Sequence, residues 1–466
     1  ITSKKENYQK VGDIIHNKQH SLLNRAKEAS DMLQEHIDND DVIRLISHND
    51  ADGISAAAVL ANALKEEKIR YHTTIVPRLK EDVINSLRSD KSSLFIFTDM
   101  GSAYVKELNT FKSDVIIADH HQVSDTESES NLVHVNPHLF GVDGSKELSG
   151  AGASYLVARG LGKKHLAYFG LVGAFGDMQG QDGFMGMNQL IVEDAKESGV
   201  LEIHEGLKIV SKSSDPLYKA LAYTFSPPLP GITGDLTGAR EFLEKMNLSY
   251  GIKFTDLDGE EQDLLKEALI NVNEDIFGLC YTVPKEIPLL RDLEEYAYIL
   301  DACGKNKKFG LALGITLGER ERVLDVALNL QREYRDQIVR GLEWAKKEGA
   351  SQLNKIQYLY SEDKILKTVM GTIASIGLSA EIFDTSKPIL GLSRLYKDIK
   401  ISGRTTRDMV ENGVDLGKAL KDASNNFTGQ GGGHDIAAGA MIPYEAKDNF
   451  LHLVDEIVEY QLEENS

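Results

Sequence analysis

The stretch DVIRLISHNDADG, residues 41–53, carries a short apolar run directly into a cluster of histidine and aspartate side chains. Its first half is apolar, β-branched and bounded by polar residues, which predicts a buried strand. His48, Asp50 and Asp52 alternate along the predicted end of this strand, so we expect them to share one face. Residues 54–67 are rich in Ala and Leu and predict a helix. The stretch therefore predicts a βα unit with candidate ligands where the strand ends.

The same arrangement recurs further along the chain. Two more apolar runs end at polar groups: residues 93–97 lead to Asp99, and residues 114–118 lead to Asp119-His120-His121. Asp177 follows a longer apolar run, which predicts a buried helix. Strands that alternate with helices predict a parallel sheet, whose carboxyl ends meet at one edge. We therefore expect these segments to converge on one site.

Each segment by itself fits a simpler role. A single aspartate after a strand is commonly a helix N-cap, and Asp52-Gly53 could form only a turn. Adjacent histidines in a strand point to opposite faces, so only one of His120 and His121 can easily bind a metal ion there. Together, however, these carboxylates would repel one another unless a cation lay between them. The combination favours a pair of divalent cations, which drive phosphoester cleavage in proteins.

The chain resembles the DHH phosphoesterase superfamily, which is named after the motif that stands here at residues 119–121. Within the superfamily it is most similar to the RecJ-like nucleases, and among these to the archaeal RecJ-like nucleases that associate with GINS. The matching segments are ISHNDADG (46–53), ADHH (118–121), VNP (135–137), LSGAG (148–152) and VGAFGDMQ (172–179). Near the C-terminus, GGGHDIAAG (431–439) matches the DHH-associated domain that partners this catalytic domain.

The resemblance implies a two-metal site. The ligands it implies are His48 and Asp50 for one ion, Asp52, His120 and Asp177 for the other, and Asp99 as the bridge between them. His121 would stabilise the charge of the scissile phosphate, and Asp119 would orient a neighbouring histidine. Oxygen and nitrogen ligands without thiolates favour Mn²⁺ or Mg²⁺, and the histidine content favours Mn²⁺. Non-catalytic relatives that serve as helicase subunits have lost several of these ligands, whereas this chain has not.

A second group of candidate residues lies in the C-terminal region. Glycines let backbone N–H groups approach phosphate closely, so Gly431, Gly432 and Gly433, followed by His434, predict a phosphate-binding loop. The resemblance adds three contacts to the substrate backbone: Ser402, Arg404 and Thr405. A basic run supports them, formed by Arg394, Lys397, Lys400, Arg404 and Arg407.

The order of these segments predicts an α/β protein with three parts. Residues 1–200 would form the catalytic DHH domain around a parallel sheet, with a leading helix over residues 1–40. Residues 201–290 predict a small, mostly helical inserted domain. Residues 291–466 predict an α/β DHH-associated domain that binds substrate. The resemblance implies an active site in the cleft between the first and last domains, and docking of a GINS subunit on the middle one.

Composition restricts the partners and the setting. A net charge of −20 argues against binding duplex DNA across a broad face, because such binding needs a basic surface. It is compatible with phosphate contacts confined to a cleft. No run of 18 apolar residues exists, so we expect no membrane span. The only cysteines, Cys280 and Cys303, lack metal-site spacing and suit a reducing compartment, so we expect a cytoplasmic protein.

We expect a two-metal-dependent exonuclease that acts on single-stranded nucleic acid and releases nucleoside monophosphates. The resemblance implies 5′→3′ action on DNA, allows 3′→5′ trimming of RNA, and points to DNA replication and repair. Two alternatives stay open. One is a phosphodiesterase of small substrates: oligoribonucleotides, phosphoadenosine phosphate or cyclic dinucleotides. The other is a replisome scaffold whose main role is to bind GINS and the replicative helicase.

Overall fold

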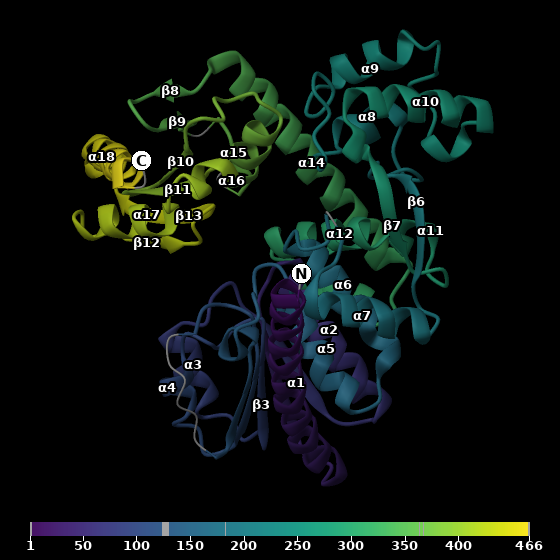
Figure 1. The fold of residues 1–466 in the computed structure, drawn as a ribbon, viewed down its shortest axis with the longest axis vertical. Coiled ribbons are helices and arrows are strands. Elements are labelled where there is room, and N and C mark those ends of the chain that lie inside the picture. The colour runs from purple at the N-terminus through teal and green to yellow at the C-terminus, as the bar shows by residue number, and fades with distance from the viewer. Residues whose placement is uncertain (1, 124–129, 182, 363, 367, 465–466) are drawn as a thin grey trace. The chain divides into compact units, whose positions relative to one another are not determined.

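The structure is a computed structural model that describes residues 2–123, 130–181, 183–362, 364–366 and 368–464, and only the backbone of residues 2–16. The chain divides into two compact units (Figure 1). The first contains residues 1–205 and 279–331, and the second contains residues 206–278 and 332–466. The predicted α/β class is confirmed, with an N-terminal parallel sheet, a helical middle region and a C-terminal α/β region.

A five-stranded parallel sheet forms the centre of the first unit. Its strands are, in spatial order, β2 (Tyr71–Ile75), β1 (Ile43–Ser47), β3 (Leu94–Thr98), β4 (Asp114–Ala118) and β5 (Leu132–Val135). The strand order reverses between the neighbours β1 and β3, because the chain proceeds to one edge from β1 and to the other from β3. Parallel sheets of this order bind ligands outside the carboxyl ends of the strands at such a point.

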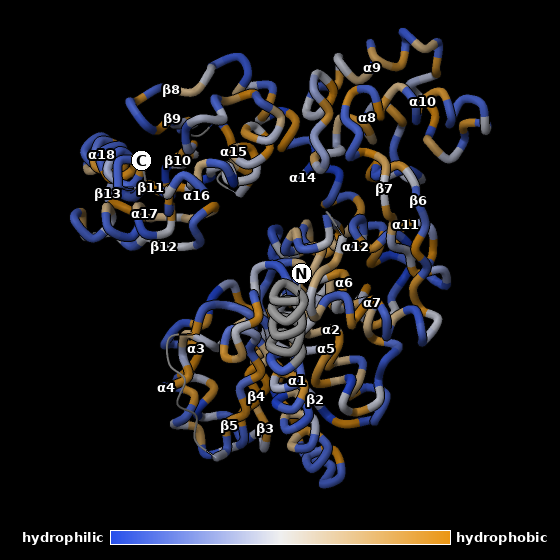
Figure 2. The backbone as a smooth tube through the Cα atoms, viewed as in Figure 1, coloured by the Kyte–Doolittle hydropathy of each residue, from blue (hydrophilic) through white to orange (hydrophobic). Residues whose placement is uncertain are grey.

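Helices cover both faces of this sheet, which explains why its strands are apolar at successive positions (Figure 2). On one face, Leu94 and Ile96 belong to the large core with α1, α2, α5 and α6. On the other face, Phe95 and Phe97 pack with α3 and α4. The helices are α1 (Thr2–Asp38), α2 (Ala51–Glu66), α3 (Glu81–Leu87), α4 (Val105–Leu108), α5 (Gly150–Gly160), α6 (Ala167–Gly176) and α7 (Gly186–Glu197).

The first unit also includes helices that follow the middle region. These are α11 (Pro288–Arg291), α12 (Leu293–Lys305) and α13 (Phe309–Thr316), and the unit ends within α14 (Arg322–Glu348). The predicted domain boundary at residue 290 differs from this division, because α12 packs against α2 and α6. Gly304 of α12 lies so close to the carbonyl oxygen of Asn49 that a Cβ there would overlap with it. This close contact supports the loop that follows β1.

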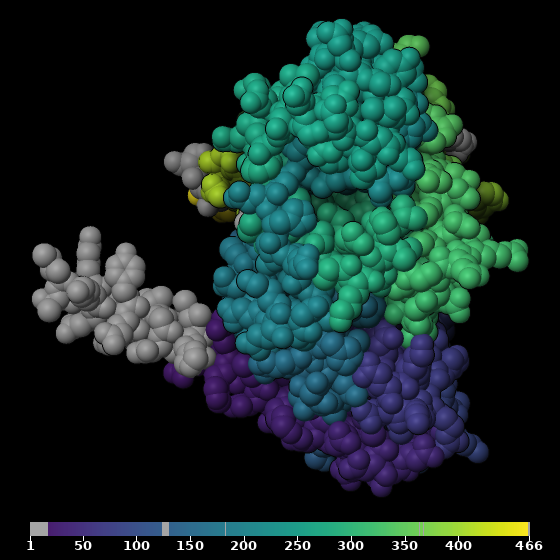
Figure 3. All heavy atoms as spheres, turned by 90° about the vertical axis from the view of Figure 1, so that its right-hand side faces the viewer, coloured from purple at the N-terminus to yellow at the C-terminus, as the bar shows by residue number. Residues whose placement is uncertain are grey.

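The middle region, residues 206–278, is mostly helical. It contains α8 (Leu217–Ala222), α9 (Leu236–Glu244) and α10 (Gly259–Val272), and it is entered and left through the paired strands β6 (Glu202–Leu207) and β7 (Phe277–Thr282). Leu221, Leu243 and Leu265, one from each helix, meet in its core. Figure 3 shows this region in teal as a continuous packed body.

A six-stranded mixed sheet forms the rest of the second unit. Its order is β12 (Gln430–Gly433), β13 (Ala437–Pro443), β11 (Asp398–Arg404), β10 (Ile389–Leu395), β9 (Gln357–Tyr360) and β8 (Ser351–Gln352). The helices are α15 (Met370–Ser379), α16 (Arg407–Glu411), α17 (Leu416–Asn425) and α18 (Lys447–Glu464). The side chains of one sheet face, including Leu392, Ile401 and Ile442, are buried in a core with α17 and α18.

The predicted glycine loop is a strand. Gly431, Gly432 and Gly433 pair with β13 as part of β12, and only His434 lies in the turn beyond it. The prediction failed because glycine normally weakens strands, so a run of glycines favours a loop until its pairing partner is known. The predicted active-site cleft between domains stays a prediction. Within the described residues, no helix combines the length and the apolar character needed to cross a membrane.

Gly304→Ala should lower the free energy of unfolding by about 1–3 kcal/mol, because the added methyl group must displace the Asn49 backbone. A matched control is Gly310→Ala in α13, where a Cβ meets no atom within 4 Å. That change should leave stability unchanged or raise it by about 0.5–1 kcal/mol. Urea unfolding of both variants measures the difference. Equal stability of the two variants would contradict the close contact.

Candidate metal centre

The segment after β1 turns at once into α2. The predicted alternation of His48, Asp50 and Asp52 on a strand is therefore wrong. The carboxylate of Asp50 instead caps the helix by accepting a hydrogen bond from the N–H of Gly53 (3.0 Å). Asp52 lies in the first helical turn. A Cβ at Gly53 would lie 2.5 Å from the carbonyl oxygen of His48, so this turn requires glycine.

Asp52 is completely buried (0% exposed) and is held by the start of another helix. Its two carboxylate oxygens accept hydrogen bonds from the N–H groups of Gly150 (2.6 Å) and Ala151 (2.9 Å), the first residues of α5. The positive end of the helix dipole stabilises the carboxylate there. Burial and the neighbouring carboxylates of Asp99 and Asp177 nevertheless raise the pKa of Asp52 well above its ordinary value. A cation beside this carboxylate would relieve that repulsion.

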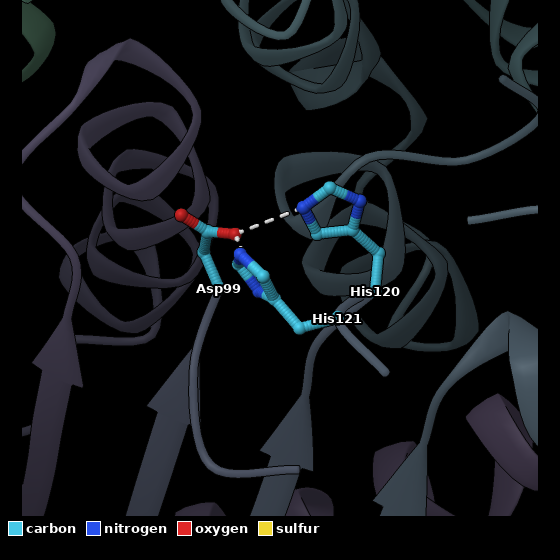
Figure 4. A group of neighbouring side chains, drawn as sticks. All are labelled: Asp99, His120 and His121. Atoms are coloured by element: carbon cyan, nitrogen blue, oxygen red, sulfur yellow. Dashed lines mark ion pairs between the residues drawn. The ribbon is translucent and has the colours of Figure 1, made fainter. Parts of the chain in front are cut away.

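The carboxylate of Asp99 has His48 near one oxygen and His120 and His121 near the other. Asp99 directly follows β3 with a left-handed backbone (φ 54°), which is uncommon outside glycine, and it is only 2% exposed. Its Oδ2 lies 3.5 Å from Nδ1 of His48, and its Oδ1 lies 3.3 Å from Nε2 of His120 and 3.7 Å from Nδ1 of His121. Figure 4 shows the imidazoles of His120 and His121 turned toward this carboxylate. Such a strained backbone is typical of a functional site.

The two histidines that follow β4 have different surroundings. His120 is buried, and its Nδ1 lies 2.7 Å from the carbonyl oxygen of Gly144. A carbonyl can only accept, so Nδ1 carries the proton, and Nε2 faces Asp177 (3.1 Å), Asp99 (3.3 Å) and Asp52 (3.6 Å). This is the usual arrangement of a histidine that binds a metal ion. His121, in contrast, has a side chain that is 47% exposed.

The carboxylate of Asp119 accepts hydrogen bonds from its own segment and from the loop that follows β3. Its Oδ1 accepts hydrogen bonds from the N–H of His120 (2.8 Å) and of His121 (3.2 Å) and lies 2.8 Å from Nδ1 of His121. Its Oδ2 accepts from the N–H of Ser102 (3.0 Å). Burial raises the pKa of this carboxyl, but the bond with His121 and the charges of both histidines hold it well below its usual range. Asp119 is placed to orient His121.

The predicted metal ligands come together in the structure. Asp177 stands directly after α6, and burial beside the other carboxylates raises its pKa to about 7. Three overlapping groups have ligand atoms within 4.8 Å of one another: His48, Asp50 and Asp99; Asp52, His120 and Asp177; and Asp99, His120 and His121. Asp99 belongs to the first and the third of these groups, and it meets the second through His120, whose Nε2 lies 3.3 Å from its Oδ1.

The donor set fits divalent cations. Within the described part of the chain, the buried Oδ1 of Asp99 receives no hydrogen bond of good geometry. Burial lowers the pKa of His48, but Asp50 and Asp99 raise it to about 11, which shows how strongly this site attracts positive charge. Carboxylate oxygens and imidazole nitrogens without thiolates suit Mn²⁺ or Mg²⁺.

From the sequence, no role was assigned to a set of polar residues that surrounds the candidate ligands, although Asn136 and Gln179 stand in the matching segments. The carbonyl of Gly144 that holds His120 also accepts from Nε2 of Gln179 (3.0 Å). Asn136 donates both to Oγ of Ser102 (2.8 Å) and to the carbonyl oxygen of His121 (2.9 Å). Asn136 directly follows β5, so its place at a strand end could have identified it. Gly144 carries no comparable signal, because it acts through its backbone.

The predicted substrate contacts lie in the second unit, so the structure describes them separately from the metal centre. Ser402 and Arg404 stand on β11, and Thr405 follows it. Gly371, in the first turn of α15, is so close that a Cβ there would lie 3.3 Å from both Nη2 of Arg404 and Oγ of Ser402. Burial lowers the pKa of Arg404, and no carboxylate among the described residues opposes this effect. The buried hydroxyl of Thr405 has no hydrogen-bond partner among the described residues.

Three protein families match the chain. They are the DHH family, N-terminal domain, over residues 42–171, the DHH-CID domain over residues 209–275, and the DHHA1 domain over residues 354–460. The first range contains all candidates of the metal centre except Asp177. The third contains the residues predicted to contact substrate.

Two relatives in sequence extend these matches. An uncharacterized protein of Methanocaldococcus jannaschii is 32% identical over 428 residues, which are 90% of this chain and 94% of that protein. The single-stranded-DNA-specific exonuclease RecJ of Bacillus subtilis is 30% identical over 145 residues, which are 29% of this chain and 18% of the exonuclease.

Two solved structures share the fold. RecJ of Thermus thermophilus in complex with Mn²⁺ superposes with a TM-score of 0.61 at 18% identity, covering 94% of this chain and 55% of that one. The chain thus spans about half the length of that RecJ. CDC45 of Entamoeba histolytica superposes with a TM-score of 0.68 at 12% identity, covering 96% of this chain and 99% of that one.

Asp99→Asn should weaken Mn²⁺ binding by at least about a hundredfold, because even residues that only support a ligand contribute about 10–100-fold. Isothermal titration calorimetry should show that the loss affects every Mn²⁺ that the wild type binds here, since Asp99 faces both halves of the site. Asp90→Asn is the control: it removes the same charge before β3 begins. Loss of one ion with full retention of the other would contradict a shared ligand.

Proposed function

Because the chain belongs to the RecJ-like branch of the DHH superfamily, we propose that it is a metal-dependent exonuclease that shortens single-stranded nucleic acid and releases nucleoside monophosphates. The observation that carries the proposal is the convergence of the predicted ligands at the point where the strand order reverses, with Asp99 facing both groups. A sheet without a metal-dependent reaction has no need to bury repelling carboxylates together.

The ligand groups support two cation positions. We propose His48 and Asp50 as ligands of one ion, with Asp99 as the bridge. The other ligands are Asp52, His120 and Asp177. When bound, a pair of divalent cations activates the attacking water and stabilises the attacking and leaving oxygens. Mn²⁺ is the proposed cation and Mg²⁺ a substitute, since both suit oxygen and imidazole ligands.

His121 and Asp119 have a different role in this proposal. Against the lowering effect of burial, Asp119 and Asp99 raise the pKa of His121 to about 9, which favours the imidazolium cation, protonated at both ring nitrogens. It is also the more exposed of the two histidines. We propose that this cation donates a hydrogen bond to the scissile phosphate, while Asp119 holds the ring in place.

The second unit supplies the proposed grip on the substrate. Arg404 offers a guanidinium that no carboxylate of the described residues neutralises, and the first turn of α15 lies beside it. Helix N-termini and arginines both favour phosphate. Ser402, Thr405 and His434 would add polar contacts, and the glycines of β12 would let the backbone approach.

The direction of cleavage and the cellular process are proposed from the resemblance to the relatives. Likeness to the single-stranded-DNA-specific exonuclease supports action on single-stranded DNA. We propose 5′→3′ polarity and a role in replication or repair, as the family resemblance implies. Trimming of RNA from the 3′ end is the second activity to test. GINS, or the replicative helicase, is the proposed protein partner of the middle region.

A replisome scaffold is the second candidate function. It is favoured by the fold shared with CDC45, a superposition that has a TM-score of 0.68 and covers 99% of the CDC45 chain. The intact ligand set favours the exonuclease over this candidate.

The test is a time course with Mn²⁺ on single-stranded DNA and RNA of equal sequence, labelled at either end. The exonuclease should release a labelled mononucleotide at once from one end. Asp119→Ala should reduce the rate strongly, and EDTA should abolish it until Mn²⁺ is added back. Restoration by Zn²⁺ alone would contradict the proposed ligand set.

The other outcomes favour the alternatives. Cleavage restricted to substrates of two to five nucleotides, or to cyclic dinucleotides, would assign a small-substrate phosphodiesterase. Bound Mn²⁺ without any cleavage, together with capture of GINS, would assign the scaffold.

Arg404→Ala should raise KM for single-stranded substrate about ten- to hundredfold, because a hydrogen bond to a charged group contributes about 1.5–3 kcal/mol. Metal affinity should not change. Arg340→Ala is the control: it removes the same charge from an exposed position of α14 in the same unit. Steady-state kinetics measure both variants, and an equal KM in the two would reject Arg404 as a substrate contact.

A further inference from the structure

A buried histidine that has no part in the proposed mechanism stands on β5. His134 is 3% exposed, and its Nε2 lies 2.9 Å from Oγ of Ser102, in the loop that follows β3. Burial lowers the pKa of His134 to about 4, although the charge of Asp119 opposes this effect. A neutral imidazole has one donor and one acceptor nitrogen, so it can form a hydrogen bond with a hydroxyl inside the core. Such a ring either fills the core or holds its partner in place.

The partner of this histidine joins several segments of the metal centre. Ser102 is completely buried, and its hydroxyl also accepts a hydrogen bond from Nδ2 of Asn136 (2.8 Å). Its backbone N–H donates to Oδ2 of Asp119 (3.0 Å). The other oxygen of that carboxylate lies 2.8 Å from Nδ1 of His121, whose carbonyl oxygen accepts from Asn136 (2.9 Å). These contacts form a closed ring, and His134 supports it at Ser102.

The loop that carries Ser102 needs such a support. Asp99 (φ 54°) and Gly101 (φ 119°) both have left-handed backbones, which are uncommon conformations. They persist only where the surrounding structure determines them. The N–H of Asp99 donates to the carbonyl oxygen of Ala118 (2.9 Å), which fixes the start of the loop. The bonds of the Ser102 side chain fix its end.

A loss of this support should reach the proposed phosphate contact. The bond with His134 selects one staggered orientation of the Ser102 hydroxyl, and thereby the direction of the backbone N–H that meets Asp119. Partners that orient a functional group in this indirect way typically contribute about 10–100-fold to activity. The chain of contacts runs from His134 through Ser102 and Asp119 to His121.

We propose that His134 and Ser102 are positioning residues that hold Asp119, and through it the imidazole of His121, in place beside the scissile phosphate. This inference rests on the proposed function and deepens it. The contact of His121 is worth most in the transition state, where charge accumulates on the phosphate oxygens. Misplacement of the ring therefore lowers kcat and leaves KM nearly unchanged.

The test compares two substitutions of His134 in the full chain. His134→Leu keeps a side chain of similar size without a hydrogen-bonding group, whereas His134→Gln returns an amide near the place of Nε2. With Mn²⁺ and single-stranded DNA, kcat of His134→Leu should fall about 10–100-fold. KM and Mn²⁺ affinity should stay within about threefold of the wild type. His134→Gln should recover most of the loss in kcat.

His36→Leu is the matched control. His36 is another buried histidine of the first unit, and its ring nitrogens lie 2.7 Å from Asp41 and 3.0 Å from Asp114. Asp114 begins β4, whereas the metal centre lies where the strands of this sheet end. The control should lower the melting temperature, because two carboxylates lose their partner, but kcat should equal that of the wild type. It thus separates a loss of stability from a loss of positioning.

Two further measurements follow the contact through Ser102. Ser102→Ala removes the hydroxyl but keeps the N–H, and kcat should fall as in His134→Leu. The double variant should fall no further, because both changes remove the same bond. Orthovanadate forms five-coordinate adducts that resemble the transition state of phosphoryl transfer. Affinity of the Mn²⁺-loaded protein for orthovanadate should fall about tenfold or more in both single variants.

Wild-type kcat in His134→Leu would overturn the inference, and so would an equal loss in His134→Leu and His134→Gln. If His134→Leu does not fold, Ser102→Ala decides, and wild-type kcat there overturns the inference.

The two proposals also fail separately. Cleavage that is indifferent to His134→Leu leaves the exonuclease standing without the positioning residues. A wild type that binds orthovanadate but cleaves no single strand rejects the exonuclease, and the orthovanadate affinities of the variants then decide the positioning. A wild type that neither cleaves nor binds orthovanadate overturns both proposals.

Discussion

Mutual repulsion among buried carboxylates is the constraint on which the first unit depends. Asp52 and Asp99 are both withdrawn from water, and Asp177 and Asp50 lie within reach of the same histidines. In a medium of low dielectric constant, such charges strongly oppose one another. The structure offsets this repulsion locally with the N-terminus of α5 below Asp52 and with imidazoles around Asp99. What remains is a strong preference for positive charge, which is the property that a cation site needs.

The architecture around the site keeps these groups in place. Each candidate is anchored where a regular element begins or ends: Asp50 caps α2, Asp99 follows β3, and Asp177 follows α6. Glycines allow the close approaches that this convergence requires, as at Gly53, where the chain turns back on His48. Gly304 likewise lets α12 approach the backbone of Asn49 closely. Asn49 stands between the candidate ligands His48 and Asp50. The metal centre is therefore coupled to helices far away in sequence.

The second unit carries the residues that we propose as contacts to the substrate. Its sheet is covered on one face by α17 and α18, and on the other face α15 packs against β10 and β11 beside Arg404.

The sequence by itself determined the α/β class, the approximate positions of the strands and the identity of the polar residues at their ends, because apolar runs and turns are local signals. It could not show that Asp50 and Asp52 belong to a helix, since a capped turn and a continuing strand carry the same residues. It also misjudged Gly431, Gly432 and Gly433, whose strand depends on pairing with β13. Only the tertiary structure decided that Asp99 faces both ligand groups and that Gly144 orients His120. These facts arise from contacts between residues distant in the chain, which local patterns do not encode.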